Sequence, residues 1–244
     1  MSEDIFMKVS IVLPTYNERE NIKILIPRIF KVLKKNKING SMIVVDDSSP
    51  DKTALIVQRL KKTYPITLIE RSGKLGIGSA YITGFKKTLE DKADVVFEMD
   101  ADLSHDPRYI PDFTKKIEQG FDVVIGSRKV EGGDVVGWNW YRKAVSAGGN
   151  FIGKRIAGVD ISDLTSGYRA FKRKVVESIG LNKIKSDGYA FQLEVLSRCI
   201  NKGFTVGVIP IMFYDRTAGK SKLSRRDMID FFWTALKIRL GKIK

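Results

Sequence analysis

Two aspartates two residues apart, Asp100 and Asp102, follow the apolar run Val95-Val96-Phe97 in the stretch MDADLSH. Residues i and i+2 of an extended chain project to the same side, so the two carboxylates are expected to converge. At about 5 Å and an effective dielectric near 20, they would repel by about 3 kcal/mol. Solvation of two loop acids is one way to relieve this repulsion. A Mg²⁺ or Mn²⁺ ion shared with substrate phosphates is the interpretation that we favour.

A second acidic pair, Asp46 and Asp47, follows the apolar run of residues 42–45. One of the two could cap a helix that begins near Pro50. The alternative, favoured by the polar ends of the neighbouring strands, is a hydrogen bond to the ribose or base of a nucleotide.

Single polar residues elsewhere offer further chemistry. His105 is the sole histidine and follows the acidic pair, so it could be a metal ligand or a proton shuttle, but exposure on a loop is the expectation. Arg128, Arg142 and Arg216 border the expected cleft, and the planar fork of arginine suits phosphate. Cys199 falls within an apolar pattern and is expected to be buried and inert.

These residues require a scaffold, and the hydrophobic pattern predicts an α/β fold with a doubly wound, mostly parallel sheet. Strands are predicted over residues 8–13, 42–45, 66–69, 94–99, 122–125 and 205–212, and most are followed by helical spacing. Further helices are predicted over 141–157, 188–201 and 225–240, with a mobile Gly-rich loop over 131–137 and a loop with a short strand over 163–171. Ligands of such sheets bind beyond the carboxyl ends of the strands, where the acidic pairs fall.

The glycine-rich stretch GKLGIGSAYITG resembles a phosphate-binding loop but lacks the third glycine of a dinucleotide fingerprint and any GK[ST] sequence. Gly76, Ala80 and Gly84 recur every four residues instead. This spacing predicts a helix that lies close to the sheet.

Composition limits the class of protein. The chain has 244 residues, a formal charge of +15 and one cysteine, so it cannot form an internal disulfide. Its first ten residues lack the pattern of a signal peptide, and its longest uncharged stretch, residues 203–214, is shorter than the roughly 20 residues that cross a bilayer. The charge admits nucleic acid, anionic lipid or phosphorylated small molecules as partners. Acidic strand ends and the lack of aromatic-basic repeats argue against nucleic acid.

The C-terminal segment is amphipathic. Ile229, Phe232, Trp233, Leu236 and Leu240 fall on one face of a helix and lysines fall off it. This face could dock on the core or lie on anionic lipid. We divide the chain into a catalytic domain, residues 1–224, and this helix, residues 225–244.

Eight stretches together resemble the inverting family 2 glycosyltransferases, and within them the dolichol-phosphate mannose synthase group. They run in order over nearly the whole chain, from about Lys8 to Leu240. The stretches are VSIVLPTYNERENI, VVDDSSPDKT, GSAYITGF, MDADLSHDP, GSRKVEGG, SDLTSGYRAF, GYAFQLEV and FYDRTAGKSKL.

The resemblance implies a nucleotide-diphospho-sugar transferase fold of the GT-A type and transfer of mannose from GDP-mannose to dolichyl or another polyprenyl phosphate. A sibling enzyme that moves glucose or another sugar is the alternative. By resemblance, the guanosine contacts are Pro14, Tyr16, Glu18, Val45 and Asp47. The metal and diphosphate contacts are Asp100, Ala101 and Asp102, with Arg128, Arg216 and Lys222 around the phosphates. Ser104 stands where some members have a glutamine metal ligand, and a water can take over that contact.

The acceptor imposes its own chemistry. A phosphate monoester is already an anionic nucleophile, so no general base is required. Arg142 is our candidate for holding that phosphate, with Ser146 one helical turn away as a second contact. Asp187 is the only substitute for a base that we identify, and capping of a helix at Gly188 explains it better.

The resemblance also implies a location. Members of this group act at the cytosolic face of a membrane, the endoplasmic reticulum in eukaryotes or the plasma membrane in archaea, and supply protein glycosylation and GPI anchor biosynthesis. We expect peripheral membrane binding, aided in some members by small membrane-anchoring subunits.

Overall fold

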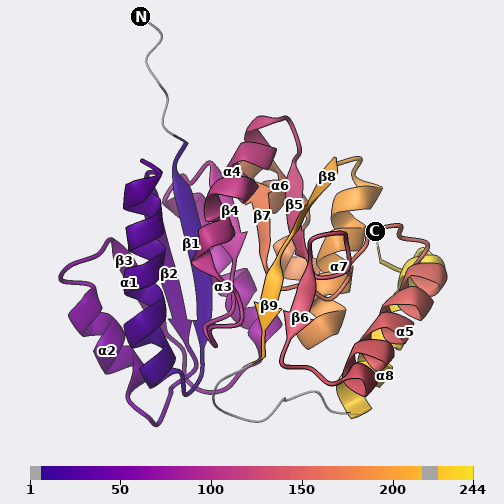
Figure 1. The fold of residues 1–244 in the computed structure, drawn as a ribbon, viewed down its shortest axis with the longest axis horizontal. Coiled ribbons are helices and arrows are strands. Elements are labelled where there is room, and N and C mark those ends of the chain that lie inside the picture. The colour runs from indigo at the N-terminus through magenta and orange to yellow at the C-terminus, as the bar shows by residue number, and fades with distance from the viewer. Residues whose placement is uncertain (1–6, 216–224, 244) are drawn as a thin grey trace, which may run out of the picture.

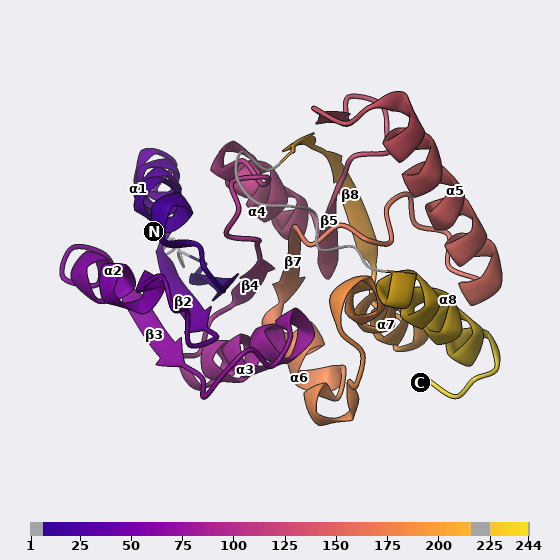
Figure 2. The ribbon, with the colours of Figure 1, turned by 90° about the horizontal axis from the view of Figure 1, so that it is seen from below.

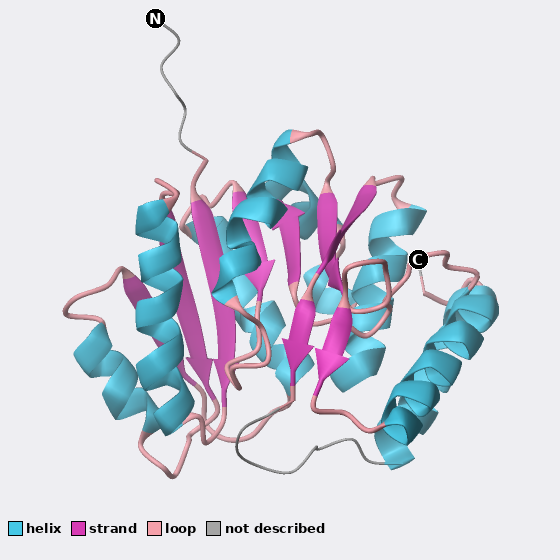
Figure 3. Cartoon of the chain, viewed as in Figure 1, coloured by secondary structure: helices cyan, strands magenta, loops and turns pink. Residues whose placement is uncertain are grey.

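A seven-stranded sheet with helices on both faces forms the body of the computed structural model (Figures 1 and 3). The structure describes residues 7–215 and 225–243. Neighbouring strands are parallel except β7, which runs antiparallel to both β4 and β5. The strand order is β3-β2-β1-β4-β7-β5-β8. The predicted α/β class and mostly parallel sheet are confirmed.

The strands of this sheet are short and largely buried. They are β1 (Val9–Thr15), β2 (Gly40–Asp46), β3 (Ile66–Glu70), β4 (Val95–Glu98), β5 (Val123–Ser127), β7 (Arg169–Lys172) and β8 (Val206–Pro210). A separate two-stranded sheet pairs β6 (Asp134–Val136) with β9 (Met212–Tyr214).

Helices connect most of the strands. The α-helices are α1 (Arg19–Lys35), α2 (Thr53–Leu60), α3 (Ile77–Glu90), α4 (Ile110–Glu118), α5 (Trp140–Ala157), α6 (Arg173–Ser178), α7 (Gly188–Asn201) and α8 (Arg225–Arg239). Two 3₁₀ turns are η1 (Pro107–Tyr109) and η2 (Leu181–Lys183). The short helix α6 has no counterpart in the sequence-based expectation.

The alternating direction of side chains along β1 separates two cores. Ile11 and Leu13 face the layer of α1, α2 and α4, whereas Val12 faces the layer that includes α3, α6 and α7 (Figure 2). All three side chains are fully buried. A strand covered on both faces reads as a continuous apolar run, which is what residues 9–13 show.

Helix α3 lies close to the sheet, as its small residues predicted. A side-chain carbon added at Gly84 would collide with Val12 of β1, and Ala80 is buried against β2. Gly76 has a different role: it precedes the helix with a φ of 95°, and a side chain there would collide with Asp187. The sheet therefore explains two of the three small residues, and Asp187 explains the third.

Two boundaries differ from the prediction. Residues 131–137 are not a loop throughout, because they contain β6. The strand predicted over 205–212 is broken at Ile211, whose N–H donates to the Ser127 carbonyl at 3.0 Å and whose carbonyl accepts from the Asp134 N–H at 3.2 Å. The side chain of Ile211 is 1% exposed. Its backbone thus joins both sheets, and β9 leaves to pair with β6.

The C-terminal helix α8 packs against α5 and α7 and lies beside α5 along one flank of the molecule (Figures 1 and 2). Phe231, Ala235 and Ile238 are its buried contacts. The apolar face identified from the sequence points elsewhere: Ile229 is 66% exposed and Trp233 is 57% exposed. Within the described ranges, no helix combines the length and the hydropathy that a membrane crossing requires.

Candidate active site

A cavity of about 390 Å³ opens at the carboxyl ends of β1, β2 and β4, the edge at which the sequence placed the ligand. The start of α7 and residue Phe213 of β9 complete its wall. The predicted site residues that line it are Pro14, Tyr16, Glu18, Asp47, Asp100, Ala101, Asp102 and Arg128. The predicted site residues among the described ones that do not line it are Val45, Ser104, Arg142 and Ser146.

Asp100 and Asp102 both reach the cavity, but through a bend. Strand β4 ends at Glu98, and Leu103 has a φ of 66°, so the extended geometry assumed from the sequence does not apply. Asp100 accepts a hydrogen bond from the Tyr81 hydroxyl at 3.0 Å. Asp102 is 7% exposed and accepts from the N–H of Ser104 at 3.1 Å. These bonds hold both carboxylates in place at the cavity.

The donor set fits a hard divalent cation that keeps part of its hydration shell. The part of the chain that the structure describes contains no group of three acidic, histidine or cysteine side chains suited to a metal. Asp100 and Asp102 offer two carboxylates, and the fully buried Ser104 hydroxyl has no hydrogen-bond partner within residues 7–215 and 225–243. Mg²⁺ and Mn²⁺ accept such a sparse oxygen set when substrate phosphates and waters complete the shell.

His105 is buried, and the expectation of an exposed loop histidine is wrong. The side chain is 2% exposed, lines the cavity and stacks on Tyr168 with ring centroids 5.0 Å apart. Its Nδ1 accepts from the N–H of Asp100 at 3.1 Å. Burial lowers the pKa of His105, so the ring is neutral at pH 7. The histidine therefore braces the bend that carries Asp100.

The two acids of the second strand end have separate roles. Asp46 does not line the cavity and accepts hydrogen bonds from the Thr15 hydroxyl and from the N–H and hydroxyl of Ser49. It fixes the turn after β2. Neither Asp46 nor Asp47 caps α2, since Asp51 accepts from the N–H of Thr53 at 3.0 Å.

Asp47 lines the cavity and forms a buried ion pair with Arg71. The guanidinium contacts Asp47 Oδ1 at 2.5 Å, and the N–H of Leu75 donates to Oδ2 at 3.0 Å. Arg71 also donates to the Gly76 carbonyl and the Ser79 hydroxyl, so it organises the loop before α3. Sequence reasoning missed this arginine, although it placed residues 71–76 at a strand end.

The part of the cavity at the end of β1 holds most of the residues that the resemblance suggested for the guanosine. Pro14, Tyr16 and Glu18 line it, and Lys74, which the sequence analysis did not single out, lies 4.8 Å from the centre of the Tyr16 ring. The side chain of Val45 is fully buried in the core instead. A ligand contact by Val45 would have to come from its backbone.

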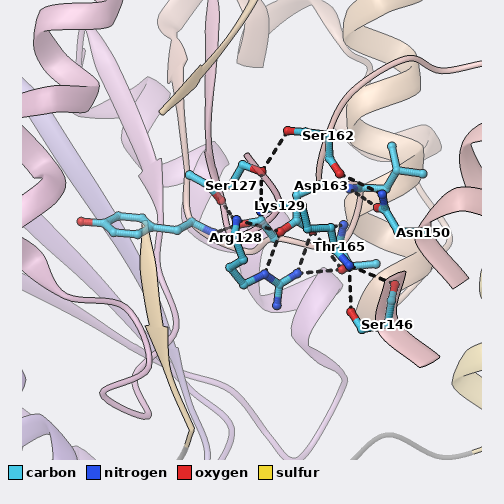
Figure 4. A network of polar contacts seen from close by, with 12 residues as sticks. Ser127, Arg128, Lys129, Ser146, Asn150, Ser162, Asp163 and Thr165 are labelled. Carbon is cyan, nitrogen blue, oxygen red and sulfur yellow. Dashed lines mark hydrogen bonds and ion pairs between the residues drawn. The ribbon is translucent and has the colours of Figure 1, made fainter. Parts of the chain in front are cut away.

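The guanidinium of Arg128 is bound to a buried carboxylate. Its Nε and Nη2 donate to the two oxygens of Asp163 at 2.7 Å each, and Nη2 also donates to the Thr165 hydroxyl at 2.9 Å (Figure 4). Burial would raise the pKa of Asp163, but Arg128 outweighs it and lowers the pKa to about 2. Asp163 was not identified from the sequence, because a buried partner for an arginine leaves no local pattern.

The predicted acceptor residues lie outside the cavity lining, on α5. Arg142 pairs with Asp215 at 2.9 Å and stacks over Trp138 at 4.4 Å. Ser146 accepts at 3.0 Å, through both its carbonyl and its hydroxyl, from the ammonium of Lys129 (Figure 4). Lys129 is a further residue that the sequence analysis did not identify.

Asp187 occupies the position before α7 but does not cap that helix, so the capping role predicted for it is wrong. Its side chain forms no capping hydrogen bond with α7. Its carboxylate instead accepts a hydrogen bond from the N–H of Gly78 at 2.6 Å. Gly78 lies in the first turn of α3, where N–H groups lack intrahelical partners. Asp187 therefore caps α3, although it is more than one hundred residues away from Gly78 in the sequence.

Behind the cavity lies a buried polar cluster around Glu98. Burial raises the pKa of Glu98 to about 7, and Arg169 and Gln192 only partly offset this effect. Arg169 is fully buried and donates to three backbone carbonyls, those of Leu164, Ser166 and Gln192. The side-chain oxygens of Glu98 and Oε1 of Gln192 form no hydrogen bond of normal geometry with the described residues.

Arg216 and Lys222, predicted to surround the diphosphate, lie outside the described residues. Cys199 is buried as expected, and burial raises the pKa of its thiol to about 12. The thiol is therefore protonated and unreactive at neutral pH.

The fold is shared with a solved glycosyltransferase. Structures of glucosyl-3-phosphoglycerate synthase from Mycobacterium tuberculosis match with TM-scores of 0.68 and 0.67 at 17% and 18% identity. The alignments cover 94% and 96% of this chain and 78% and 80% of that protein. The first of these structures contains Mn²⁺, UDP and phosphoglyceric acid. The predicted nucleotide-diphospho-sugar transferase fold of the GT-A type is confirmed.

Two curated proteins are similar in sequence. A polyprenol monophosphomannose synthase of Mycolicibacterium smegmatis is 40% identical over 216 residues, which cover 88% of this chain and 80% of that protein. A dolichol-phosphate mannosyltransferase of Pyrococcus furiosus is 42% identical over 228 residues, 92% of this chain, which spans 62% of the length of that relative. The model of the family described as glycosyl transferase family 2 matches residues 10–180. The chain belongs to glycosyltransferase family 2.

Proposed function

We propose that the protein transfers mannose from GDP-mannose to dolichyl or another polyprenyl phosphate. The observation that carries this proposal is the 40% identity to a polyprenol monophosphomannose synthase across 88% of the chain. The cavity at the carboxyl ends of the strands, with two carboxylates on one wall, supports it independently.

The donor half of the proposal assigns the nucleotide to the β1 and β2 ends of the cavity. Pro14, Tyr16, Glu18 and Asp47 line this part and contact the guanosine, with Val45 contributing through its backbone. Asp100 and Asp102 hold a divalent ion, Mg²⁺ or Mn²⁺, that neutralises the diphosphate when bound. Arg216 and Lys222 are assigned to the same diphosphate on the family resemblance.

The acceptor half needs cations rather than a base. The attacking oxygen of a polyprenyl phosphate is already ionised at pH 7, so positioning and charge stabilisation carry the reaction. Arg142 binds this phosphate by exchanging Asp215 for it, and its side chain is 39% exposed and so accessible. Ser146 offers a hydroxyl on the same helix, with the ammonium of Lys129 beside it. Attack from the face opposite the diphosphate inverts the anomeric carbon and gives a β-linked product.

The paired helices α5 and α8 suit a membrane surface, from which a lipid acceptor would be reached. Trp140 is 79% exposed and Phe151 is 64% exposed on α5, while Ile229 and Trp233 project from α8. Lys143 is on α5, and the ammonium of Lys237 lies 6.0 Å from the centre of the Trp233 ring. Exposed aromatic residues next to cations are typical of helices that lie in the interface of anionic lipid. We assign this surface to the cytosolic face of a membrane.

The direct test offers the protein short-chain dolichyl phosphate and a panel of labelled nucleotide sugars, each with Mn²⁺, with Mg²⁺ and with EDTA. We expect labelled lipid from GDP-mannose only, and no product in EDTA until metal is restored. Preference for a glucose donor would replace the proposal with the sibling activity. Equal transfer in EDTA and in Mn²⁺ would overturn the metal assignment.

A further inference from the structure

The wall of the cavity formed by the start of α7 carries two polar side chains that the proposed reaction does not use, Asp187 and Gln192. We propose that these two side chains bind hydroxyl groups of the transferred sugar and so select which sugar the enzyme accepts. The inference rests on the proposed function, because it names the sugar subsite of the same cavity.

Asp187 presents a fixed carboxylate to the cavity. One oxygen, Oδ1, accepts the N–H of Gly78, and the other is pressed against Gly76, where a side-chain carbon would collide with it. No arginine or lysine forms an ion pair with Asp187 within the described residues. A carboxylate held by one backbone donor keeps acceptor capacity for further donors. Sugar hydroxyls are donors of this kind.

The segment that carries Asp187 is anchored, so its carboxylate is preorganised. The hydroxyl of Ser186 donates to Glu194 Oε2 at 2.6 Å. The other oxygen of Glu194 receives Nε and Nη2 of the buried Arg198 at 2.9 and 2.8 Å. Arg198 also donates to the carbonyl of Lys183 at 3.3 Å. These contacts hold residues 183–187 against α7 and explain the glutamate of the GYAFQLE stretch.

Gln192 supplies an independent sign that a ligand group is missing from this wall. The side chain is 6% exposed and lines the cavity, yet its Oε1 has no hydrogen-bond partner within the described residues. Buried amide oxygens are nearly always paired, and an orphan marks a place for a ligand or a water. The Gln192 side chain also lies next to Glu98.

The two groups lie five residues apart at the start of α7 and can distinguish sugars by the orientation of their hydroxyls. A sugar that offers an O–H to both acceptors satisfies them, whereas an epimer leaves a buried acceptor unpaired. A site built in this way discriminates by about 10- to 100-fold for each lost hydrogen bond. The GYAFQLE stretch would then act in sugar choice rather than in nucleotide binding.

The test compares binding of a nucleotide sugar with binding of its nucleotide diphosphate. Isothermal titration in Mn²⁺ is run on the wild type to find the preferred donor of the panel, and then on Gln192→Met and Asp187→Asn. Asparagine keeps an acceptor for Gly78, and methionine keeps the volume of glutamine. The matched control is Ser197→Ala, which removes another orphan oxygen from the same helix outside the cavity lining.

We expect each site variant to bind the preferred donor about 10-fold more weakly, while its affinity for the nucleotide diphosphate alone is unchanged. Equal losses for both ligands, or no loss in either variant, would overturn the sugar subsite. If the wild type prefers a donor other than GDP-mannose, the proposed function fails, and the same comparison made with that donor still decides the subsite.

Discussion

The half of the molecule before β5 and the half after it differ in how exposed apolar side chains are distributed. Large exposed hydrophobic residues in the first half are scattered, such as Ile24 on α1 and Leu55 on α2. In the second half they gather on two adjacent helices, α5 and α8, where Trp140 is 79% exposed and Ile229 is 66% exposed. Scattered exposure is normal for a soluble surface, whereas a shared patch marks an interaction site.

The polar side chains differ between the strand ends and helix α5. At the strand ends they close on one another, as in the buried pairs of Asp47 with Arg71 and of Arg128 with Asp163. On α5, in the second half, the side chains of Arg142 and Lys143 are 39% and 41% exposed although each forms an ion pair. The strand ends are therefore built to hold a ligand in a fixed form, and α5 keeps cations that a phosphate can recruit. Four predictions test this division.

The largest effect is expected from Asp102→Ala. Loss of this carboxylate should lower transfer by at least about 10³-fold, because it removes a charge that acts where the diphosphate leaves. The loss should be the same for a long lipid acceptor and a short soluble one, since Asp102 lies at the strand ends rather than on the exposed surface of α5 and α8. Initial rates measure it, and the matched control is Asp112→Asn, an exposed acid on α4. Activity of the Asp102 variant within 10-fold of wild type would contradict the site.

Arg128→Ala should be the most destabilising change, by about 3–5 kcal/mol, because it leaves Asp163 charged and buried without its partner. Urea unfolding at pH 7 measures it. The control is Arg173→Ala, whose pair with Glu177 is exposed and contributes about 0–1 kcal/mol. Since the pKa of Asp163 is lowered to about 2, the pair stabilises the wild type above pH 4 and this contribution is lost between about pH 4 and pH 2. Equal losses in the two variants would contradict the prediction.

Glu98→Gln should raise stability at high pH only. The pKa of Glu98 is about 7 in the folded state, above the ordinary value of 4.5, so the folded state binds the extra proton between these values. Stability of the wild type therefore falls as pH rises from 4.5 to 7. The variant should exceed it by about 3 kcal/mol at pH 8 and by nothing at pH 4. A difference that does not change with pH, measured by urea unfolding, would show that Glu98 does not titrate this way.

The smallest effect is expected from the pair Trp140→Ala and Trp233→Ala. Binding to vesicles with 30% anionic lipid should weaken about 10-fold, since two interfacial aromatic anchors are lost. Rates with a short soluble acceptor should not change, and stability should stay within about 0.5 kcal/mol. Co-sedimentation measures binding. The control is the pair Ile24→Ala and Leu55→Ala in the other half. Equal loss in both pairs would remove the distinction between the halves.

Much of the fold could be read from the sequence, because strands covered on both faces and amphipathic helices leave strong local patterns. Residues 9–13 and helix α1 are examples. The position of β7 could not be read, since the choice between parallel and antiparallel neighbours depends on contacts far apart in the chain. The split of residues 206–214 into β8 and β9 was missed for the same reason: Ile211 is apolar like its neighbours, and only its backbone bonds set it apart.

The site followed the same rule. Asp100 and Asp102 were found because two acids after an apolar run are unusual at any strand end. The burial of His105 and the partner of Asp187 were not found, because each depends on a segment that folds over from elsewhere: Tyr168 stacks on the histidine, and Gly78 reaches the aspartate. The role of a side chain could be predicted where neighbouring residues in the sequence determine it. It could not be predicted where a partner distant in the sequence determines it.

The antiparallel strand β7 sits between β4 and β5 in the sheet, although it follows both in the chain. During synthesis β5 has no neighbour to pair with on that side until residues 169–172 have emerged from the ribosome. The inner edges of β4 and β5 stay open to other chains for this interval. Pairing across such sequence distances also slows folding. The insertion of this strand thus joins the two halves into a single cooperative unit, and neither half has a complete sheet before it arrives.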